Sequence, residues 1–150
     1  MQAIVVYESL WGNTAAIARA IAEGIGPEAQ ALSTADATAD VIAGADLIVA
    51  GAPVHAFSLP TESSRRNAGK TPAPDLSHPP MRAWLQGVPA GQGRCAAFQT
   101  AFRWSPSGAT GAIGRGLEHA GYRRVAKGRR FIVTGGSGPL RAGEVELARA

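Results

Sequence analysis

Four residues that can bind an anion lie close together near the start of the 150-residue chain: Ser9, Gly12, Asn13 and Thr14. They belong to the segment ESLWGNT, which follows a short apolar run and precedes an alanine-rich stretch. Glycine lets the backbone approach a ligand, and hydroxyl and amide groups can bind its oxygens. Because the first N–H groups of a helix are unpaired and partly positive, this turn can hold a phosphate without lysine or arginine.

Composition alone leaves a second interpretation of this segment open. An ordinary strand–turn–helix cap uses the same residue types. The segment also lacks the Gly-Lys-Ser/Thr ending of a Walker loop and the GxGxxG pattern of a dinucleotide-binding turn. The spacing therefore favours a phosphate cradle only weakly.

Alternating strands and helices are predicted around this segment. Residues 4–7 form a short β-branched run typical of a buried strand, and Ile17, Ile21 and Ile25 recur at helical spacing within residues 14–25. Further strands are predicted at residues 29–32, 46–53, 94–99 and 130–135. Further helices are predicted at residues 36–42, with Asp36 as the N-cap, and at residues 81–85. Another helix is predicted to end at His119, and the last one to begin near Ala142.

This order predicts an α/β fold with a parallel sheet, helices on both faces and right-handed crossovers. We expect one domain over residues 1–150, with a last helix cut short by the end of the chain. Ligands of open parallel sheets bind beyond the carboxyl ends of the strands, where the strand order reverses. The irregular segments that follow the first, third and fourth predicted strands all fall on that edge.

Five segments together resemble the flavodoxin family, specifically small bacterial flavodoxin-domain proteins. They are YESLWGNTAAIARAIAEGI, GAPVHAFSLPTESSRRNA, MRAWL, FQT with the later SGATGAIGRGLEHAGY, and FIVTGGSGPLRAGE. The resemblance covers nearly the whole chain in order. It implies a flavodoxin-like three-layer sandwich with a five-stranded parallel sheet of order 2-1-3-4-5, and flavin mononucleotide (FMN) as the cofactor.

The resemblance also implies the cofactor-binding residues. The phosphate loop would be Ser9, Leu10, Trp11, Gly12, Asn13 and Thr14; one side of the flavin ring would face Pro53, Val54, His55, Ala56 and Phe57; the other side would face Thr100, Ala101, Phe102 and Trp104, with Gly108 letting the next helix begin close by. Trp11 stands where flavodoxins often have threonine. This loses one hydroxyl, and the indole ring could instead cover the ribityl chain.

A flavin ring is large, flat and mostly apolar, so it needs aromatic or aliphatic walls. His55, Phe57, Phe102 and Trp104 are the candidates. Each has an alternative role: His55 as a loop residue bonded to backbone, Phe57 and Trp104 as anchors in the core, and Phe102 as a surface aromatic.

Metal and thiol chemistry are not predicted. His78 and His119 have no Cys or carboxylate at ligand spacing. Cys95 is the only cysteine and lies in an apolar segment, so we expect a buried thiol and no internal disulfide. Glu8 and Asp46 do not form the acidic cluster of a phospho-receiver domain. No side chain is predicted to be catalytic, because outer-sphere electron transfer needs no acid or base.

Charge is unevenly distributed along the chain. Residues 1–62 carry one base and seven acids, and residues 63–150 carry fourteen bases and four acids, so the two parts have charges of −6 and +10. The basic residues of 123–130 are predicted to precede the last strand, at the amino end of the sheet and away from the flavin. They form either a solvated face or a docking patch for an acidic partner. Arg65, Arg66, Lys70 and Arg103 are expected nearer the flavin, where they could steer an anionic partner or a nicotinamide phosphate.

Two functions from different classes follow from these observations. The first is an FMN-binding protein that transfers electrons, either as a carrier or as a small NAD(P)H-dependent reductase with a quinone or similar acceptor. The alternative is a flavodoxin-fold binding or structural module without flavin, which Trp11 and the short last helix motivate. We expect a cytoplasmic protein whose partner is a redox protein or a small electron acceptor. Nucleic acid is not expected, since the basic residues lack interleaved aromatics, and neither is a membrane.

Overall fold

The computed structural model describes residues 1–54, 60, 75–105, 108–135 and 138–150. Its elements, in chain order, are β1 (Ala3–Tyr7), α1 (Asn13–Ile25), β2 (Gln30–Ser33), α2 (Ala39–Ile42), β3 (Leu47–Pro53), α4 (Met81–Gln86), β4 (Arg94–Ala101), α5 (Thr110–His119), β5 (Arg123–Arg124), β6 (Arg129–Ile132) and α6 (Glu144–Arg149). No helix in these described ranges is both long enough and apolar enough to cross a bilayer.

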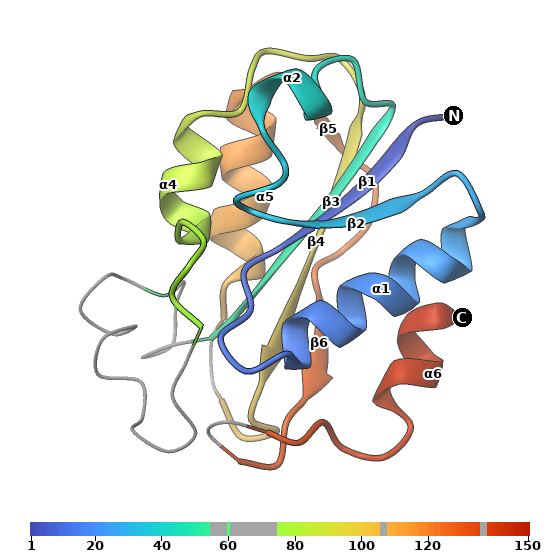
Figure 1. The fold of residues 1–150 in the computed structure, drawn as a ribbon, viewed down its shortest axis with the longest axis vertical. Coiled ribbons are helices and arrows are strands. Elements are labelled where there is room, and N and C mark those ends of the chain that lie inside the picture. The colour runs from blue at the N-terminus through green and yellow to red at the C-terminus, as the bar shows by residue number, and fades with distance from the viewer. Residues whose placement is uncertain (55–59, 61–74, 106–107, 136–137) are drawn as a thin grey trace.

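The strands form one parallel sheet of order β2-β1-β3-β4-β5, with β6 paired to β4 as well (Figure 1). This confirms the predicted flavodoxin-like order. The prediction of a single fifth strand is wrong, because two strands share that place. β5 pairs with the start of β4 (Arg94↔Arg123), and β6 pairs with its end (Ala101↔Ile132). Between them the chain passes so close to Thr110 that a side chain at Gly128 would collide with it.

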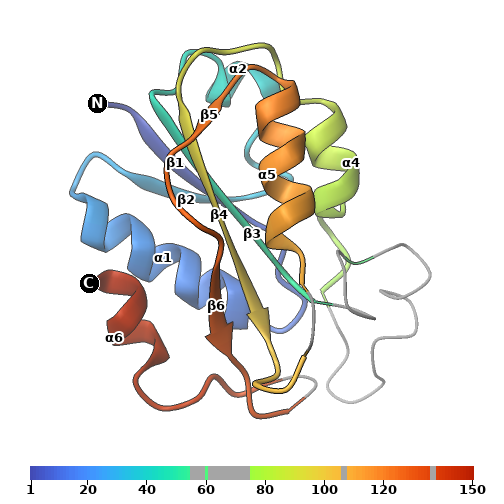
Figure 2. The same cartoon turned by 180° about the vertical axis from the view of Figure 1, so that it is seen from behind.

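Helices cover both faces of the sheet, as predicted (Figures 1 and 2). In β1, Ile4 and Val6 join the apolar cluster beneath α2, α4 and α5, whereas Val5 joins the cluster beneath α1 and α6. The central strands therefore bury both faces, which explains their continuous apolar composition. Trp84 packs in the first cluster, and its Nε1–H donates to the Ala37 carbonyl at 2.8 Å.

Several predicted boundaries are corrected. α2 begins at Ala39, because Asp36 lies in a turn in which its N–H donates to the Ser33 carbonyl. α6 begins at Glu144, after Gly143 in the left-handed region (φ 89°). The strand predicted to reach residue 135 ends at Ile132.

One of these corrections changes the site. β4 extends two residues beyond the prediction, because Thr100 pairs with Phe131 and Ala101 pairs with Ile132. Both residues were predicted to lie in a loop, and both are instead fixed in the sheet.

Candidate cofactor site

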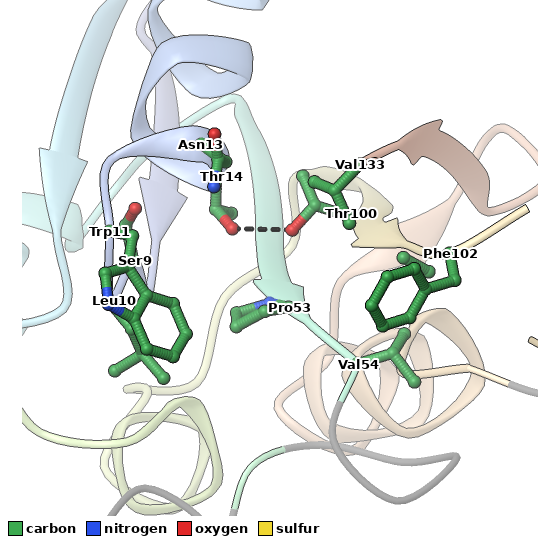
Figure 3. A pocket seen from close by; sticks show the side chains of 11 residues that line it. Ser9, Leu10, Trp11, Asn13, Thr14, Pro53, Val54, Thr100, Phe102 and Val133 are labelled. Atoms are coloured by element: carbon green, nitrogen blue, oxygen red, sulfur yellow. Dashed lines mark hydrogen bonds between the residues drawn. The ribbon is translucent and has the colours of Figure 1, made fainter. Parts of the chain in front are cut away.

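A pocket lies at the carboxyl edge of the sheet (Figure 3). It is beside the point between β1 and β3 where the strand order reverses, so that the chain leaves these two strands toward opposite faces of the sheet. Its lining residues are uncharged: Ser9, Leu10, Trp11, Asn13, Thr14, Pro53, Val54, Thr100, Ala101, Phe102 and Val133. The pocket leaves about 40 Å³ open to the centres of water-sized groups, and its empty space is about 410 Å³ when the open mouth is included. Since one water needs about 10–15 Å³ by the first measure, the pocket has room for a phosphate-sized group and opens to solvent.

Ser9 forms the inner part of the turn between β1 and α1. Its Oγ accepts hydrogen bonds from the N–H groups of Gly12 (3.1 Å) and Ala15 (3.2 Å), and the side chain is buried. The hydroxyl oxygen therefore caps the first turn of α1, and the hydroxyl hydrogen can still be donated to another group. Gly12 has φ 92°, a conformation that favours glycine, and it lines a neighbouring groove rather than this pocket.

Thr14 and Thr100 meet across the pocket floor. Their Oγ1 atoms lie 2.8 Å apart, and the residues are 2 % and 3 % exposed (Figure 3). One hydroxyl donates to the other, so the pair connects the first turn of α1 to the end of β4 and keeps one more proton to donate. Thr100 was predicted to line the flavin ring. In the structure it lines the pocket beside Thr14, and its contact with the ring stays a prediction.

The donor set fits a phosphate. Three buried hydroxyls, those of Ser9, Thr14 and Thr100, converge where α1 presents its positive end, and no carboxylate lines the pocket. The Asn13 side chain lies on the same turn and lines the pocket too. These groups can bind a dianion through neutral donors.

Two buried contacts hold the loop in place from behind. The Ser9 N–H donates to His78 Nε2 at 3.1 Å, and Glu8 Oε1 accepts from the Met81 N–H at 2.8 Å. Both side chains are buried. Sequence reasoning missed these roles. The polar Glu8 at the end of an apolar strand was the one available signal, since a buried carboxylate needs hydrogen-bond donors.

The side walls of the pocket are apolar. Leu10 and Trp11 stand on one side, Phe102 on the other, and Pro53 and Val54 lie between them (Figure 3). Trp11 is only partly buried and lines the space without filling it. The remaining lining residue, Val133, was not predicted; its N–H donates to the Ala101 carbonyl at the end of the β4–β6 ladder.

The loop after β4 departs from the prediction. Phe102 and Trp104 stack on each other, with ring centroids 5.1 Å apart and an interplanar angle of 11°. Trp104 is 71 % exposed and does not line the pocket, so its alternative role as a core anchor is wrong. Phe102 alone of this aromatic pair lines the pocket.

Gly108 serves the helix rather than the pocket. Gln99 Oε1 accepts from the N–H groups of Ala109 (2.7 Å) and Thr110 (3.3 Å), which caps α5. A side chain at Gly108 would collide with the Gln99 amide, so glycine allows this cap. The predicted ring contacts His55, Ala56 and Phe57 lie outside the described residues, as do Arg65, Arg66 and Lys70.

The placement of the basic residues is partly wrong. Arg123 and Arg124 lie at the amino end of the sheet as predicted, but Arg129 and Arg130 pair with Phe98 and Gln99 in the second half of β4. The Arg130 guanidinium donates from Nη1 to the carbonyls of Phe102 (3.3 Å) and Arg103 (3.4 Å). A cation therefore supports the loop at the pocket.

Cys95 lies far from the pocket, at the amino end of β4. It is fully buried, and burial raises the pKa of its thiol, with a further increase from Glu118 and an opposing effect of Arg124. Within the described part of the chain, no three His, Cys, Asp or Glu side chains group as a metal site would require.

Comparison with known proteins agrees with this architecture. The family model for the flavodoxin domain matches residues 4–65. An archaeal flavodoxin has 22 % sequence identity and a TM-score of 0.68, with 99 % of this chain and 92 % of the other covered. Oxidised flavodoxin 2 from Bacillus cereus has 15 % identity and a TM-score of 0.68, with coverages of 99 % and 93 %.

A similar domain also occurs within a larger protein. Rubredoxin:oxygen oxidoreductase from Desulfovibrio gigas has 15 % identity and a TM-score of 0.65, and the match covers 99 % of this chain but 33 % of that one. No curated protein matches the sequence. At these identities the solved structures bear on the fold alone. Residues 4–65 match the flavodoxin domain in sequence, and the whole chain has the fold of flavodoxins.

Proposed function

We propose that this chain binds FMN and transfers electrons with it. The observation that carries the proposal is the convergence of Ser9, Thr14 and Thr100 hydroxyls at the N-terminus of α1, in an uncharged pocket at the strand-order reversal. FMN, when bound, would supply the redox chemistry itself.

The phosphate would be held by Ser9, Asn13 and Thr14, with Thr100 behind Thr14. Each hydroxyl already uses its oxygen or its proton within the protein, so its orientation is set before a ligand arrives. Such preorganisation lowers the entropy lost on binding. His78 and Glu8 would act as positioning residues, because they hold the loop backbone rather than face the pocket.

The ring would lie at the open mouth, between the Trp11 side and the Phe102 side. Apolar walls favour a flat aromatic group and disfavour a charged reduced form, because they exclude water. His55, Ala56 and Phe57 remain predicted ring contacts. Pro53 and Val54, which precede them, lie in the pocket lining and support this.

Carrier and reductase both remain compatible with such a site, and no described side chain needs to act as an acid or base. Steady-state turnover with NADPH or NADH and a quinone separates them, since a carrier shows none without a partner enzyme. We further propose a cytoplasmic location and a redox protein as the partner, which the family's electron-transfer role supports at a general level.

The test is a titration of the purified chain with FMN, read by quenching of flavin fluorescence, with riboflavin as the matched ligand. Tight FMN binding and much weaker riboflavin binding are expected, because only FMN carries the phosphate. A colourless protein that binds neither flavin would favour the flavin-free module. The partly buried Trp11, which motivated that alternative, leaves the pocket open.

A further inference from the structure

Trp104 is exposed to an unusual degree for a tryptophan. It is 71 % accessible, whereas Trp84 is 8 % accessible and Trp11 is partly buried. Large aromatic side chains usually bury most of their area, since their exposure to water costs free energy. An exposed tryptophan beside a pocket mouth therefore needs an explanation.

The loop that carries Trp104 is held in a defined conformation. The Trp104 ring stacks on Phe102, which lines the pocket, and the Ser105 N–H donates to the Phe102 carbonyl at 3.2 Å. Arg130 donates to the same carbonyl and to that of Arg103. These carbonyls lie beyond the last rung of the β4–β6 ladder, so the guanidinium binds backbone groups that the sheet leaves free.

Positive charge dominates the part of the sheet next to the Trp104 loop. Residues 94–132, which form β4, α5, β5 and β6, contain eight basic residues and one acidic residue, Glu118. The acids of the first 53 residues belong to the β1, β2 and α2 side of the sheet or to α1. The strand order thus converts a charge difference along the chain into a basic edge. Arg103 is exposed there and forms no ion pair with any described residue.

Two simpler explanations account for part of this pattern. Charged side chains on an edge strand prevent it from pairing with a strand of another molecule. This explains the basic residues but not the exposed tryptophan. A small anion could bind one or two arginines, but the basic residues extend from Arg123, opposite Arg94, to Arg130, opposite Gln99, which is roughly 17 Å at 3.3 Å per residue. That span suits a macromolecule.

We propose that Arg103, Trp104 and Arg130, here called the Trp104 surface, dock a protein partner with an acidic face. Tryptophan and arginine are the residue types that contribute most strongly to protein interfaces, and charge complementarity raises the rate and specificity of association. This inference deepens the proposed function, because Phe102 connects the Trp104 surface to the pocket. A docked acidic redox protein would cover the mouth.

The test is calorimetric titration of the full chain, with FMN added, against two redox proteins of opposite charge. An acidic plant-type ferredoxin is the probe, and cytochrome c, which is basic, is the control. Binding of the ferredoxin is expected at 20 mM salt and a large loss at 300 mM, because exposed charges are screened within about 10 Å at 0.1 M salt. No binding of cytochrome c is expected.

Variants locate the contact. Trp104→Ala and Arg103→Glu should each weaken ferredoxin binding by about tenfold or more. Arg19→Glu is the matched control, because Arg19 is an exposed arginine on α1 and its substitution changes the net charge equally. It should alter binding less than about twofold. All three substituted residues are exposed, and urea unfolding of each variant verifies that it is folded.

Three results would overturn the inference: no ferredoxin binding at low salt, equal losses in Arg19→Glu and Arg103→Glu, or unchanged binding in Trp104→Ala. The FMN titration is independent of this readout. If ferredoxin binds with these variant effects but FMN does not bind, the proposed function fails and the docking surface stands. If FMN binds and ferredoxin does not, the docking surface alone fails.

Discussion

Both ends of β4 contain buried residues, but the two ends are chemically different. Near the start, Cys95 belongs to an apolar core cluster, and Tyr122 packs against Gly91 beside it. Near the end, Gln99 and Thr100 are buried polar residues, and each has a hydrogen-bond partner on a helix. One end forms the core, and the other forms the site.

Helix direction explains the difference. In a parallel α/β sheet, the helix after each strand begins at the carboxyl edge, so α1 and α5 both present unpaired N–H groups there. Ser9 caps the first and Gln99 the second. Polar side chains at this edge are therefore required by the backbone, and a ligand phosphate can use the donors that remain. The amino edge instead presents the carbonyl ends of the helices, which need hydrogen-bond donors, and the Gly121 and Gly91 N–H groups serve the end of α5 there.

The largest expected effect is that of Thr14→Val on FMN binding. Loss of the hydroxyl removes a donor to the phosphate and the bond to Thr100, so FMN affinity should fall roughly 10- to 100-fold, given about 1.5–3 kcal/mol for a hydrogen bond to a charged group. Riboflavin affinity should change little. Fluorescence titration of both ligands measures this.

Thr38→Val is the control for that experiment, since Thr38 is exposed and makes no side-chain cap bond. Thr100→Val loses the same inter-hydroxyl bond and should weaken FMN less than Thr14→Val, because Thr14 lies on the helix turn. Equal losses for FMN and riboflavin in Thr14→Val would refute the phosphate cradle.

Gln99→Leu is expected to reduce stability next most. It leaves the Ala109 and Thr110 N–H groups at the start of α5 without their acceptor, and about 1–3 kcal/mol of unfolding free energy should be lost. Urea denaturation measures it. Gln30→Leu, an exposed change on β2, is the control, and an equal loss there would show that the cap contributes nothing.

Phe102→Ala should affect the pocket differently from Thr14→Val. Phe102 lines the mouth, so we expect FMN and riboflavin to lose affinity equally, by roughly three- to tenfold for an aromatic contact of about 0.5–1.5 kcal/mol. Phe102→Tyr, which keeps a ring, should bind both flavins nearly as well as the parent. A selective loss of FMN in Phe102→Ala would contradict the division between phosphate floor and apolar mouth.

The smallest effect is expected at the other end of β4. Burial raises the pKa of the Tyr122 phenol above 10.0, as it raises the pKa of Cys95 above 9.0, so the folded state favours the neutral forms. Their stabilising contribution is complete below the ordinary pKa values and is lost as the pH rises through the raised ones. Unfolding free energy should therefore decrease above about pH 9.

Tyr122→Phe should reduce that alkaline decrease, as measured by urea denaturation from pH 7 to pH 11, and should leave FMN affinity at pH 7 unchanged. A change in FMN affinity would mean that the two ends of β4 are not independent. An unchanged pH dependence would mean that the Tyr122 phenol does not titrate differently in the folded state.

Local patterns predicted much of the fold and part of the site. The isoleucine spacing of α1, the β-branched run of β1 and the turn at Gly12 depend on neighbours in sequence, and each appears in the structure. Of the sixteen predicted cofactor-binding residues, ten line the pocket. An eleventh, Gly12, lies in the turn beside the pocket. Gly108 supports α5, Trp104 faces solvent, and three lie outside the described residues.

Contacts between distant segments were not predictable in this way. Nothing near Thr100 in the sequence indicates that β4 continues through it, since β6, 31 residues later, supplies its pairing partner Phe131. The predicted position of Arg130 was wrong for the same reason: the fifth strand divides where Gly128 passes Thr110, which local composition does not show.

By itself, then, the sequence determined the order of strands and helices, the polar turn before α1 and the overall charge difference between the two parts of the chain. Tertiary structure alone decided that Thr14 meets Thr100, that His78 holds Ser9, and that Arg130 supports the loop with an exposed Trp104. The reason is physical: periodicity and turn chemistry act over a few residues, whereas these contacts depend on how whole elements pack and where each strand ends.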